Sequence, residues 1–475
     1  MSVWKISTVA VLLVLIAPGP QEASAAAELT AIVGGTVVHP ERPGAPSDPN
    51  ATIIISGDRI QAVGPAKSTP VPKGATVIDA KGKWVIPGLI DSHVHFFQSA
   101  NPFTRPDAID ATKVVPFAKE VERNKARLPA TFKVWLASGV TSVADMGGPF
   151  WNFEVRDAAR SSPAAPRVAV AGPLISMVDR PQLDLGDPPI IKVTSVEAAR
   201  ELSRKLLEKK PDFVKVWFIW RPGDDLAAQE QIVKAAGDAA HGAGVRFAVH
   251  ATELDVAKAA LRAGADILVH SVNNKPVDEE FLNLAKRNKA LYIPTLFVVD
   301  GYTLVRHNNW RPTEQERRLG DPQILEHMND LERARRELLP ATMIPLIRQS
   351  ISFRPGVRDF AMENLRKVWD AGIPVAMGTD AGNVGTLHGP SIFREMTLMV
   401  ESGLTMPEVL ASATVIGAKT MGLEKDLGAV EPGKLADLVI LNANPLGKVD
   451  NLSHAHRVIK GGKVYDPIQL MRSIR

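Results

Sequence analysis

Residues 84–95 have the sequence Trp-Val-Ile-Pro-Gly-Leu-Ile-Asp-Ser-His-Val-His, and this stretch decides the fold. Its apolar residues, Trp84 to Ile86 and Leu89 to Ile90 on either side of Pro87-Gly88, are typical of a buried strand. Side chains two apart on a strand point to the same face, so His93 and His95 project together from its end. The stretch therefore predicts a strand that delivers two imidazoles to one site.

Seven further short aliphatic runs follow along the chain, at 140–146, 167–171, 212–219, 245–251, 265–271, 291–296 and 373–379. Helical patterns such as Ser195–Lys209, Ala227–Gly242 and Glu253–Ala263 fall between them. Alternating strands and helices of this number predict an α/β fold of the (β/α)8 TIM-barrel type. The alternative is an open doubly wound sheet, but no G-x-G-x-x-G motif follows the first strand.

The two ends of the chain have a different sequence pattern, which predicts short strands separated by turns. Residues 29–85 and 422–470 are each too short to close a sheet core alone. We therefore expect both termini to meet in one small composite β-sandwich, with the barrel at 86–421.

Two connections are longer than a simple barrel unit requires, at 96–127 and 298–370. The second contains many arginines and no lysine between 301 and 360, with helical apolar spacing. Long excursions after barrel strands lie over the catalytic face, so a lid or substrate wall is one interpretation of 301–360. A solvated helical hairpin is the other.

Composition excludes several classes of protein. The chain has 475 residues, 45% of them hydrophobic and 23% charged, with a formal net charge of +4 and no cysteine. These values are typical of a globular protein and exclude disulfides and thiolate zinc sites. The basic run at 333–336 is flanked by Glu332 and Glu337, so we expect a solvated helix face and no nucleic-acid partner.

The first 25 residues predict a signal peptide. Lys5 precedes an apolar core at 6–16, and Ala23-Ser24-Ala25 supplies the small residues that precede cleavage. The core is shorter than the ~20 residues that cross a bilayer, although an uncleaved anchor is the alternative. We expect an exported protein, periplasmic or secreted, without stable membrane insertion after cleavage.

A lysine within the run 212–219 adds to the two histidines. Lys215 stands in the apolar sequence Phe213-Val-Lys-Val-Trp-Phe218, where burial of an ammonium group is costly. Burial favours the neutral amine, which can add carbon dioxide to form a carbamate with two oxygens for two cations. A lysine that snorkels from the strand end is the alternative.

Three further candidate ligands end apolar runs of the same kind. His250 follows Phe-Ala-Val, His270 follows Ile-Leu-Val, and Asp380 follows Val-Ala-Met-Gly-Thr. A histidine in this position is often only a core residue, but two in successive units favour a common site. A buried carboxylate needs a cation, and a metal ion would supply it.

These residues and their order resemble the metal-dependent amidohydrolase superfamily, namely His93-x-His95, Lys215, His250, His270 and Asp380. More narrowly, they resemble its binuclear members with a carboxylated lysine, in the imidazolonepropionase-like and prolidase-like branch. Supporting stretches are Gly-Val-Thr-Ser-Val at 139–143, Met-Gly-Thr-Asp-Ala at 377–381 and Gly-Ala-Val-Glu-Pro-Gly-Lys-Leu-Ala-Asp-Leu-Val at 428–439. The resemblance covers nearly the whole mature chain.

The resemblance implies a role for each of these side chains. His93, His95 and Asp380 would hold one divalent metal ion, His250 and His270 a second, and carboxylated Lys215 would bridge both. Zinc is the expected metal, and cobalt or manganese suit the same ligands. Two such ions lower the pKa of a shared water and supply hydroxide, and Asp380 would accept its proton and pass it to the leaving nitrogen.

The surroundings of the site depart from the family pattern. Trp217-Phe-Ile-Trp-Arg221 stands where relatives often have Thr-Gly-Gly, so the substrate does not carry over. Trp217, Arg221 and His388 are candidate substrate-binding residues. The alternatives are that Trp217 packs under the helices and that Arg221 is an exposed loop residue.

We predict an amidohydrolase that cleaves carbon–nitrogen bonds of a small-molecule substrate, such as a dipeptide or an N-acyl amino acid. A hydrolase of cyclic amides, lactones or phosphoesters on the same site is an alternative, as is a metal-binding protein without turnover. The sequence leaves open whether the chain forms a homo-oligomer.

Overall fold

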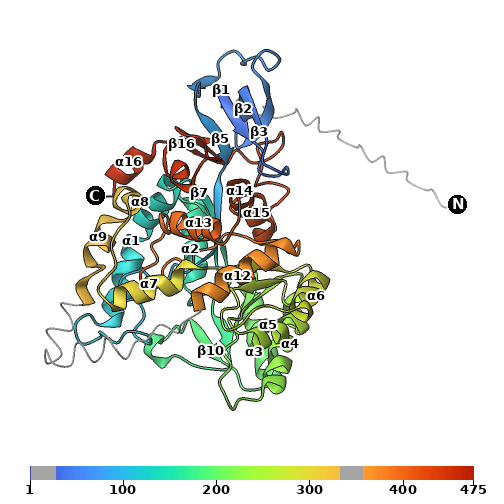
Figure 1. The fold of residues 1–475 in the computed structure, drawn as a ribbon, viewed down its shortest axis with the longest axis vertical. Helices are drawn as coiled ribbons and strands as arrows, with labels where there is room; N and C mark the ends of the chain where they lie inside the picture. The colour runs from blue at the N-terminus through green and yellow to red at the C-terminus, as the bar shows by residue number, and fades with distance from the viewer. Residues whose placement is uncertain (2–27, 332–356, 475) are drawn as a thin grey trace.

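The computed structural model describes Met1, residues 28–331 and residues 357–474 of the chain. The fold is α/β, with three sheets and helices packed around the two parallel ones (Figure 1). The predicted signal peptide at 1–25 lies, apart from Met1, outside the described residues. Among the described residues, no helix has the length and apolar character needed to span a bilayer.

Strands from both ends of the chain pair in one eight-stranded sheet, shown at the top of Figure 1. Its path is β17-β16-β15-β5-β1-β2-β3, with β4 paired to β1. The two halves join where β15 runs antiparallel to β5, with Val439 opposite Ile86. The bounds are β1 Leu29–Val38, β2 Ser47–Ser56, β3 Arg59–Pro65, β4 Thr76–Asp79, β5 Trp84–Pro87, β15 Leu438–Leu441, β16 Ala455–Lys460 and β17 Lys463–Tyr465. The division of the chain into sandwich and barrel domains stays a prediction.

Two parallel sheets form the body of the protein. The three-stranded sheet has the order β6-β7-β8, and the six-stranded sheet has the order β10-β9-β11-β12-β13-β14. Their bounds are β6 Leu89–Val94, β7 Val140–Asp145, β8 Arg167–Val170, β9 Leu174–Ser176, β10 Ile190–Lys192, β11 Phe213–Trp217, β12 Arg246–His250, β13 Ile267–Val269 and β14 Leu291–Ile293. Seven of these nine strands lie within predicted runs, whereas β9 and β10 were not predicted from the sequence.

The run at 373–379, predicted as the eighth strand, makes only isolated bridges. Val375 bridges Tyr292 of β14, and Ala381 bridges Val94 of β6. The left-handed backbone of Asp380, with φ of 61°, interrupts regular strand geometry at this point. The pairing therefore gives two parallel sheets in place of one eight-stranded sheet, and the closed barrel stays a prediction.

The helices that follow the strands confirm the predicted amphipathic segments. They are α3 Val196–Glu208, α4 Leu226–Gly242 and α5 Leu254–Arg262. Ser195 begins α3 by accepting a hydrogen bond from the amide of Ala198 at 3.1 Å, which satisfies a free N–H group of the first turn. The other helices are α1 Phe117–Ala137, α2 Asn152–Ser161, η1 Pro181–Leu183, α6 Glu279–Asn288, α7 Phe297–Arg306, α8 Glu314–Leu319, α9 Pro322–His327, α12 Val357–Asp370, α13 Ser391–Glu401, α14 Met406–Ser412, α15 Val415–Met421, η2 Val449–Ser453 and α16 Pro467–Arg472.

Gly88 lies between β5 and β6, where the mixed sheet meets the three-stranded parallel sheet. A Cβ atom at this position would lie 2.1 Å from Oγ1 of Thr141, closer than packed atoms allow. We expect Gly88→Ala to lower the free energy of unfolding by about 1–3 kcal/mol, because the crowded site must shift. Urea unfolding measures this value.

Gly242 supplies the matched control for that substitution. It ends α4, and a Cβ atom there meets nothing within 4 Å. Gly242→Ala should leave stability unchanged or raise it by up to about 1 kcal/mol. Equal stability of the two alanine variants would contradict the crowding at Gly88.

Candidate active site

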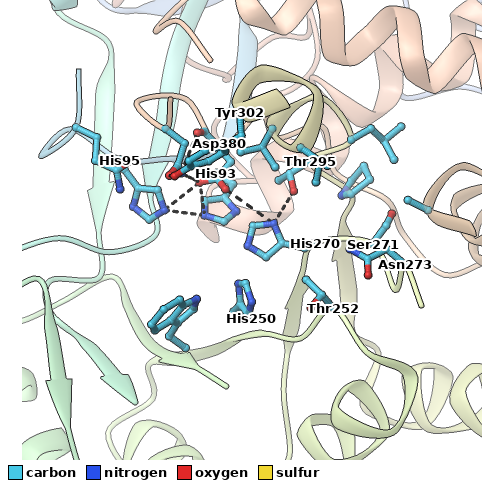
Figure 2. Close-up of a pocket in the computed structure, with 18 of the residues that line it drawn as sticks. His93, His95, His250, Thr252, His270, Ser271, Asn273, Thr295, Tyr302 and Asp380 are labelled. Atoms are coloured by element: carbon cyan, nitrogen blue, oxygen red, sulfur yellow. Dashed lines mark hydrogen bonds and ion pairs between the residues drawn. The ribbon is translucent and has the colours of Figure 1, made fainter. Parts of the chain in front are cut away.

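The predicted ligands line one cavity of about 250 Å³ at the carboxyl ends of the parallel strands (Figure 2). All six side chains take part: His93, His95, Lys215, His250, His270 and Asp380. His93 lies in β6 and His95 directly follows it, Lys215 lies in β11 and His250 in β12, His270 follows β13, and Asp380 follows the run 373–379. Because neighbouring parallel strands end at the same edge, residues nearly three hundred positions apart lie together.

His93, His95 and Asp380 form the tightest part of the cluster. Nε2 of His93 and Nε2 of His95 lie 3.2 Å apart. Oδ1 of Asp380 lies 3.4 Å from Nε2 of His93 and 3.1 Å from Nε2 of His95. Nδ1 of His95 donates to the carbonyl oxygen of Gly147 at 2.5 Å, which leaves the Nε2 lone pair toward the cavity.

His270 and His250 extend the cluster across the cavity. One ligand atom from each of His93, His270 and Asp380 lies within 4.8 Å of the other two. Nδ1 of His270 is 2.5 Å from Oγ1 of Thr295, and the rings of His250 and His270 have centroids 4.4 Å apart. Figure 2 shows His250 on the opposite side of the cluster from Asp380.

Lys215 is buried in β11, with 2% of its surface exposed. Among the described residues, no hydrogen bond or ion pair satisfies its amine. Burial lowers the pKa of Lys215 to about 7, against the opposing effect of the Asp380 and Asp145 carboxylates. A substantial fraction of this lysine is therefore the neutral amine at pH 7.

Burial also favours the neutral form of three of the four imidazoles. It holds the pKa of His93 and of His250 well below the usual value and lowers the pKa of His270 to about 4. Neutral imidazole is the form that binds metal ions. Burial raises the pKa of Asp380, but the His93 and His95 imidazoles outweigh it and hold that pKa well below the usual value.

The donor set fits a divalent cation. Imidazole nitrogens and a carboxylate oxygen converge within 3.1–3.4 Å, and a cation can satisfy their lone pairs together. Nδ1 of His93 is buried without a hydrogen-bond partner among the described residues.

Three side chains of the site stand on left-handed backbone. The φ angles are 76° at His270, 46° at Thr295 and 61° at Asp380. Such conformations cost about 1–3 kcal/mol each outside glycine and cluster at functional sites. A β-branched residue such as Thr295 is especially unusual there. The fold therefore holds these side chains at the cost of local strain.

The three predicted substrate-binding residues lie at different places relative to the cavity. Trp217 lines the cavity, with the Arg180 guanidinium 4.7 Å from its ring centroid. Arg221 is exposed and does not line the cavity, because the chain turns away from the site after β11. His388 does not line it either, since its Nε2 donates to the carbonyl oxygen of His95 at 3.1 Å from behind. The substrate contacts of Arg221 and His388 therefore stay predictions, and neither side chain lines this cavity.

The sequence prediction missed several polar residues of the cavity wall, among them Arg105, Tyr302 and Asn383. Arg105 belongs to the long connection after the first strand, and Tyr302 to α7, in the long connection after β14. With Arg358 and Ala361 of α12 also at the cavity, the described part of the segment 298–370 forms a wall of the site. The predicted segment 301–360 lies partly outside the described residues.

Glu395 supports this wall from behind. Its carboxylate on α13 accepts the backbone amides of Leu296 and Phe297 at 2.8 and 2.9 Å, at the start of α7. Burial raises the pKa of Glu395 to about 8, and the two amides offset this only in part. The folded chain thus holds a proton that the unfolded chain releases near pH 4.5.

This shift predicts a pH-dependent stability. The contribution of Glu395 is fully present below about pH 4.5 and is lost as the pH rises toward 8. Glu395→Gln should be less stable than the wild type at pH 5, because its NH2 group replaces an oxygen that accepts a backbone amide. Between pH 5 and pH 9 the wild type should lose about 4 kcal/mol of unfolding free energy relative to this variant, which has no titrating group at the position. Urea unfolding at both pH values measures the difference, and parallel pH profiles would contradict the shifted pKa.

Comparisons with known proteins show what the chain is similar to. The protein-family model described as "Amidohydrolase family" matches residues 84–465. An imidazolonepropionase from Alkaliphilus metalliredigens (strain QYMF) is 26% identical over 435 residues, covering 87% of this chain and 89% of the relative. One from Geobacillus kaustophilus (strain HTA426) is 39% identical over 117 residues, which span 23% of this chain and only 27% of the relative.

A solved structure has the same fold. It is described as a Xaa-Pro dipeptidase with bound methionine in the active site, and it superposes with a TM-score of 0.68 at 23% identity. The match covers 92% of this chain and 100% of that one. The chain therefore belongs to the amidohydrolase family.

Proposed function

We propose that the protein is a metal-dependent hydrolase that cleaves carbon–nitrogen bonds of small substrates. The observation that carries this proposal is the convergence of four histidines, a buried lysine and an aspartate on one cavity. Family membership supports the reaction class.

In this proposal the cluster holds two divalent metal ions, with zinc as the expected metal. His93, His95 and Asp380 would hold one ion and His250 and His270 the other, and Lys215, carboxylated by CO2, would supply further oxygen ligands. The neutral, unpaired amine of Lys215 supports the modification: its lone pair bonds to the carbon of CO2, and the nitrogen then loses a proton. When bound, the ions would lower the pKa of a water molecule and polarise the substrate carbonyl.

The remaining chemistry belongs to the side chains of this protein. Asp380 is ionised, so it accepts the proton of the attacking water and passes it to the leaving nitrogen. Thr295 and Gly147 hold the rings of His270 and His95 in fixed orientations. The hydrogen bond from His95 to Gly147 fixes the His95 tautomer and keeps its Nε2 atom available.

The barrel is part of the same proposal. The amide of Ser92 donates to the carbonyl oxygen of Met377 at 2.9 Å, and that of Tyr292 donates to Pro374 at 2.9 Å. Across the other gap, the amide of Asp212 donates to Val170 at 2.9 Å. These hydrogen bonds support a closed barrel in which residues 373–381 take the place of an irregular eighth strand.

The substrate we propose is a dipeptide or an N-acyl amino acid. A cavity of about 250 Å³, with the ring of Trp217 at its wall, suits a small apolar acyl group. The described similarity of fold to a Xaa-Pro dipeptidase supports the same class. We also propose that the protein is exported to the periplasm or secreted, on the strength of the sequence of residues 1–25.

A screen of metal-loaded protein tests this function. Dipeptides and N-acyl amino acids are incubated beside lactones and a phosphotriester, and released amines are identified by mass. We expect amine release that a chelator abolishes and added zinc restores. Hydrolysis of only the lactones or the phosphotriester would contradict cleavage of carbon–nitrogen bonds.

A further inference from the structure

Asn383 connects the Asp380 carboxylate to the cavity wall. Its Nδ2 donates to Oδ1 of Asp380 at 2.7 Å. Its Oδ1 accepts one hydrogen bond from Nη1 of Arg105 at 2.9 Å and another from the Tyr302 hydroxyl at 2.8 Å. Asn383 is 4% exposed, so water contributes little to these contacts.

These two donors determine which way the Asn383 amide points. A guanidinium has only donors, and burial raises the pKa of Tyr302 to about 12, so its hydroxyl carries a proton at neutral pH. An exchange of the amide oxygen and nitrogen would set N–H groups against both donors. The NH2 group is therefore aimed at Asp380.

Arg105 is itself held in place. Its Nε and Nη2 atoms donate to the two carboxylate oxygens of Asp107, each at 2.7 Å. The Asp107 side chain is 3% exposed and lies 3.4 Å from Nε of Arg180. A bidentate pair of this kind fixes the plane of the guanidinium, and with it the Nη1 atom that reaches Asn383.

Asn383 also stabilises the strained backbone of Asp380. Its amide N–H and its Nδ2 both lie 3.3 Å from the Asp380 carbonyl oxygen. Together with the bond to Oδ1, these contacts close a turn around a residue with φ of 61°. Oδ2 of Asp380 is left toward His270, 4.0 Å from its Nδ1.

We propose that Asn383, aimed by Arg105 and Tyr302, is a positioning residue that fixes the rotation of the Asp380 carboxylate. One carboxylate oxygen is held by the Asn383 amide and the other stays free toward His270. This assignment rests on the proposed function, because it is the proton transfer by Asp380 that depends on the orientation.

Asn383→Leu removes the NH2 group at similar volume. We expect kcat to fall about 10–100-fold, the usual effect of losing a partner that orients a metal ligand, with KM and bound metal close to wild type. In the cobalt-loaded protein, the visible absorption bands should change, because the Asp380 carboxylate turns. Tyr302→Phe keeps Asn383 and Arg105 and should give a smaller fall in kcat in the same direction.

Tyr465→Phe is the matched control, since it removes a hydroxyl that donates to the carbonyl oxygen of Pro163, away from the cavity. Its kcat and cobalt spectrum should stay at wild-type values. If Asn383→Leu does not fold, the comparison of Tyr302→Phe with Tyr465→Phe decides the question.

Unaltered kcat and an unaltered cobalt spectrum in Asn383→Leu would overturn the assignment, and so would a change confined to KM or a loss of metal from both network variants. If no amide substrate is turned over, the cobalt spectra of the variants still decide the role of Asn383. A wild type that binds no metal would instead contradict the proposed function, and the orientation of Asp380 with it.

Discussion

Asp380→Asn is expected to lower kcat by about 10³-fold or more while most of the bound metal remains. The asparagine has the shape of the aspartate and keeps one oxygen for the metal, but it accepts no proton. In the folded protein, Asp380 is ionised and lies between the imidazoles of His93 and His95. The water that attacks the substrate would then have no group to take its proton.

Kinetics and metal analysis of the purified variant separate the two functions of Asp380. Asp212→Asn makes the same chemical change at a carboxylate that accepts the Val170 amide away from the cavity, and it should keep kcat within about twofold. A near-wild-type rate for Asp380→Asn would remove Asp380 as the proton acceptor. Loss of all metal would show that this residue mainly retains the ion.

Lys215→Ala is expected to lose bound metal and to lose turnover with it. The substitution removes the amine that we propose as the bridging ligand and leaves four imidazoles and one carboxylate for two cations. The Asp380 carboxylate would then be the single negative charge that neutralises two divalent ions. Acetate or propionate at millimolar concentration should diffuse into the space of the missing side chain and restore part of the rate.

Lys215→Arg is the control for this rescue. Arginine keeps a cation at the position, but its guanidinium stays protonated and forms no carbamate. It should be as inactive as the alanine variant and should not respond to acetate, because its side chain still fills the space. Full activity of Lys215→Ala without added carboxylate would refute the bridge.

Much of the fold could be predicted, because buried parallel strands appear in the sequence as short runs of apolar residues. The runs around β11, β12 and β13 are short and aliphatic, and the helices between them have clear caps such as Ser195. The run at 373–379 is apolar in the same way. The left-handed conformation of Asp380 directly after it could not be predicted from the sequence pattern. Strands β9 and β10 have three residues each, too few for periodicity to detect.

In the candidate site too, residues that follow regular strands could be predicted, and residues in irregular segments could not. His250, His270 and Asp380 follow apolar runs, so their place at a common edge could be inferred from the order of strands alone. Arg105 and Asn383 lie in irregular segments. The hydrogen bond of 2.9 Å from Nη1 of Arg105 to Oδ1 of Asn383 depends on how two loops distant in the sequence pack together. His388 follows the eighth run as a ligand-like residue would, but the turn after Asp380 directs it behind His95.

Anomalous diffraction from crystals of the zinc-loaded protein, recorded near the zinc absorption edge, tests the proposed metal centre most directly. We expect two peaks in the cavity, one in contact with His93, His95 and Asp380 and the other with His250 and His270, with a modified Lys215 between them. A cavity without a peak, or zinc bound only elsewhere on the protein, would contradict the metal centre.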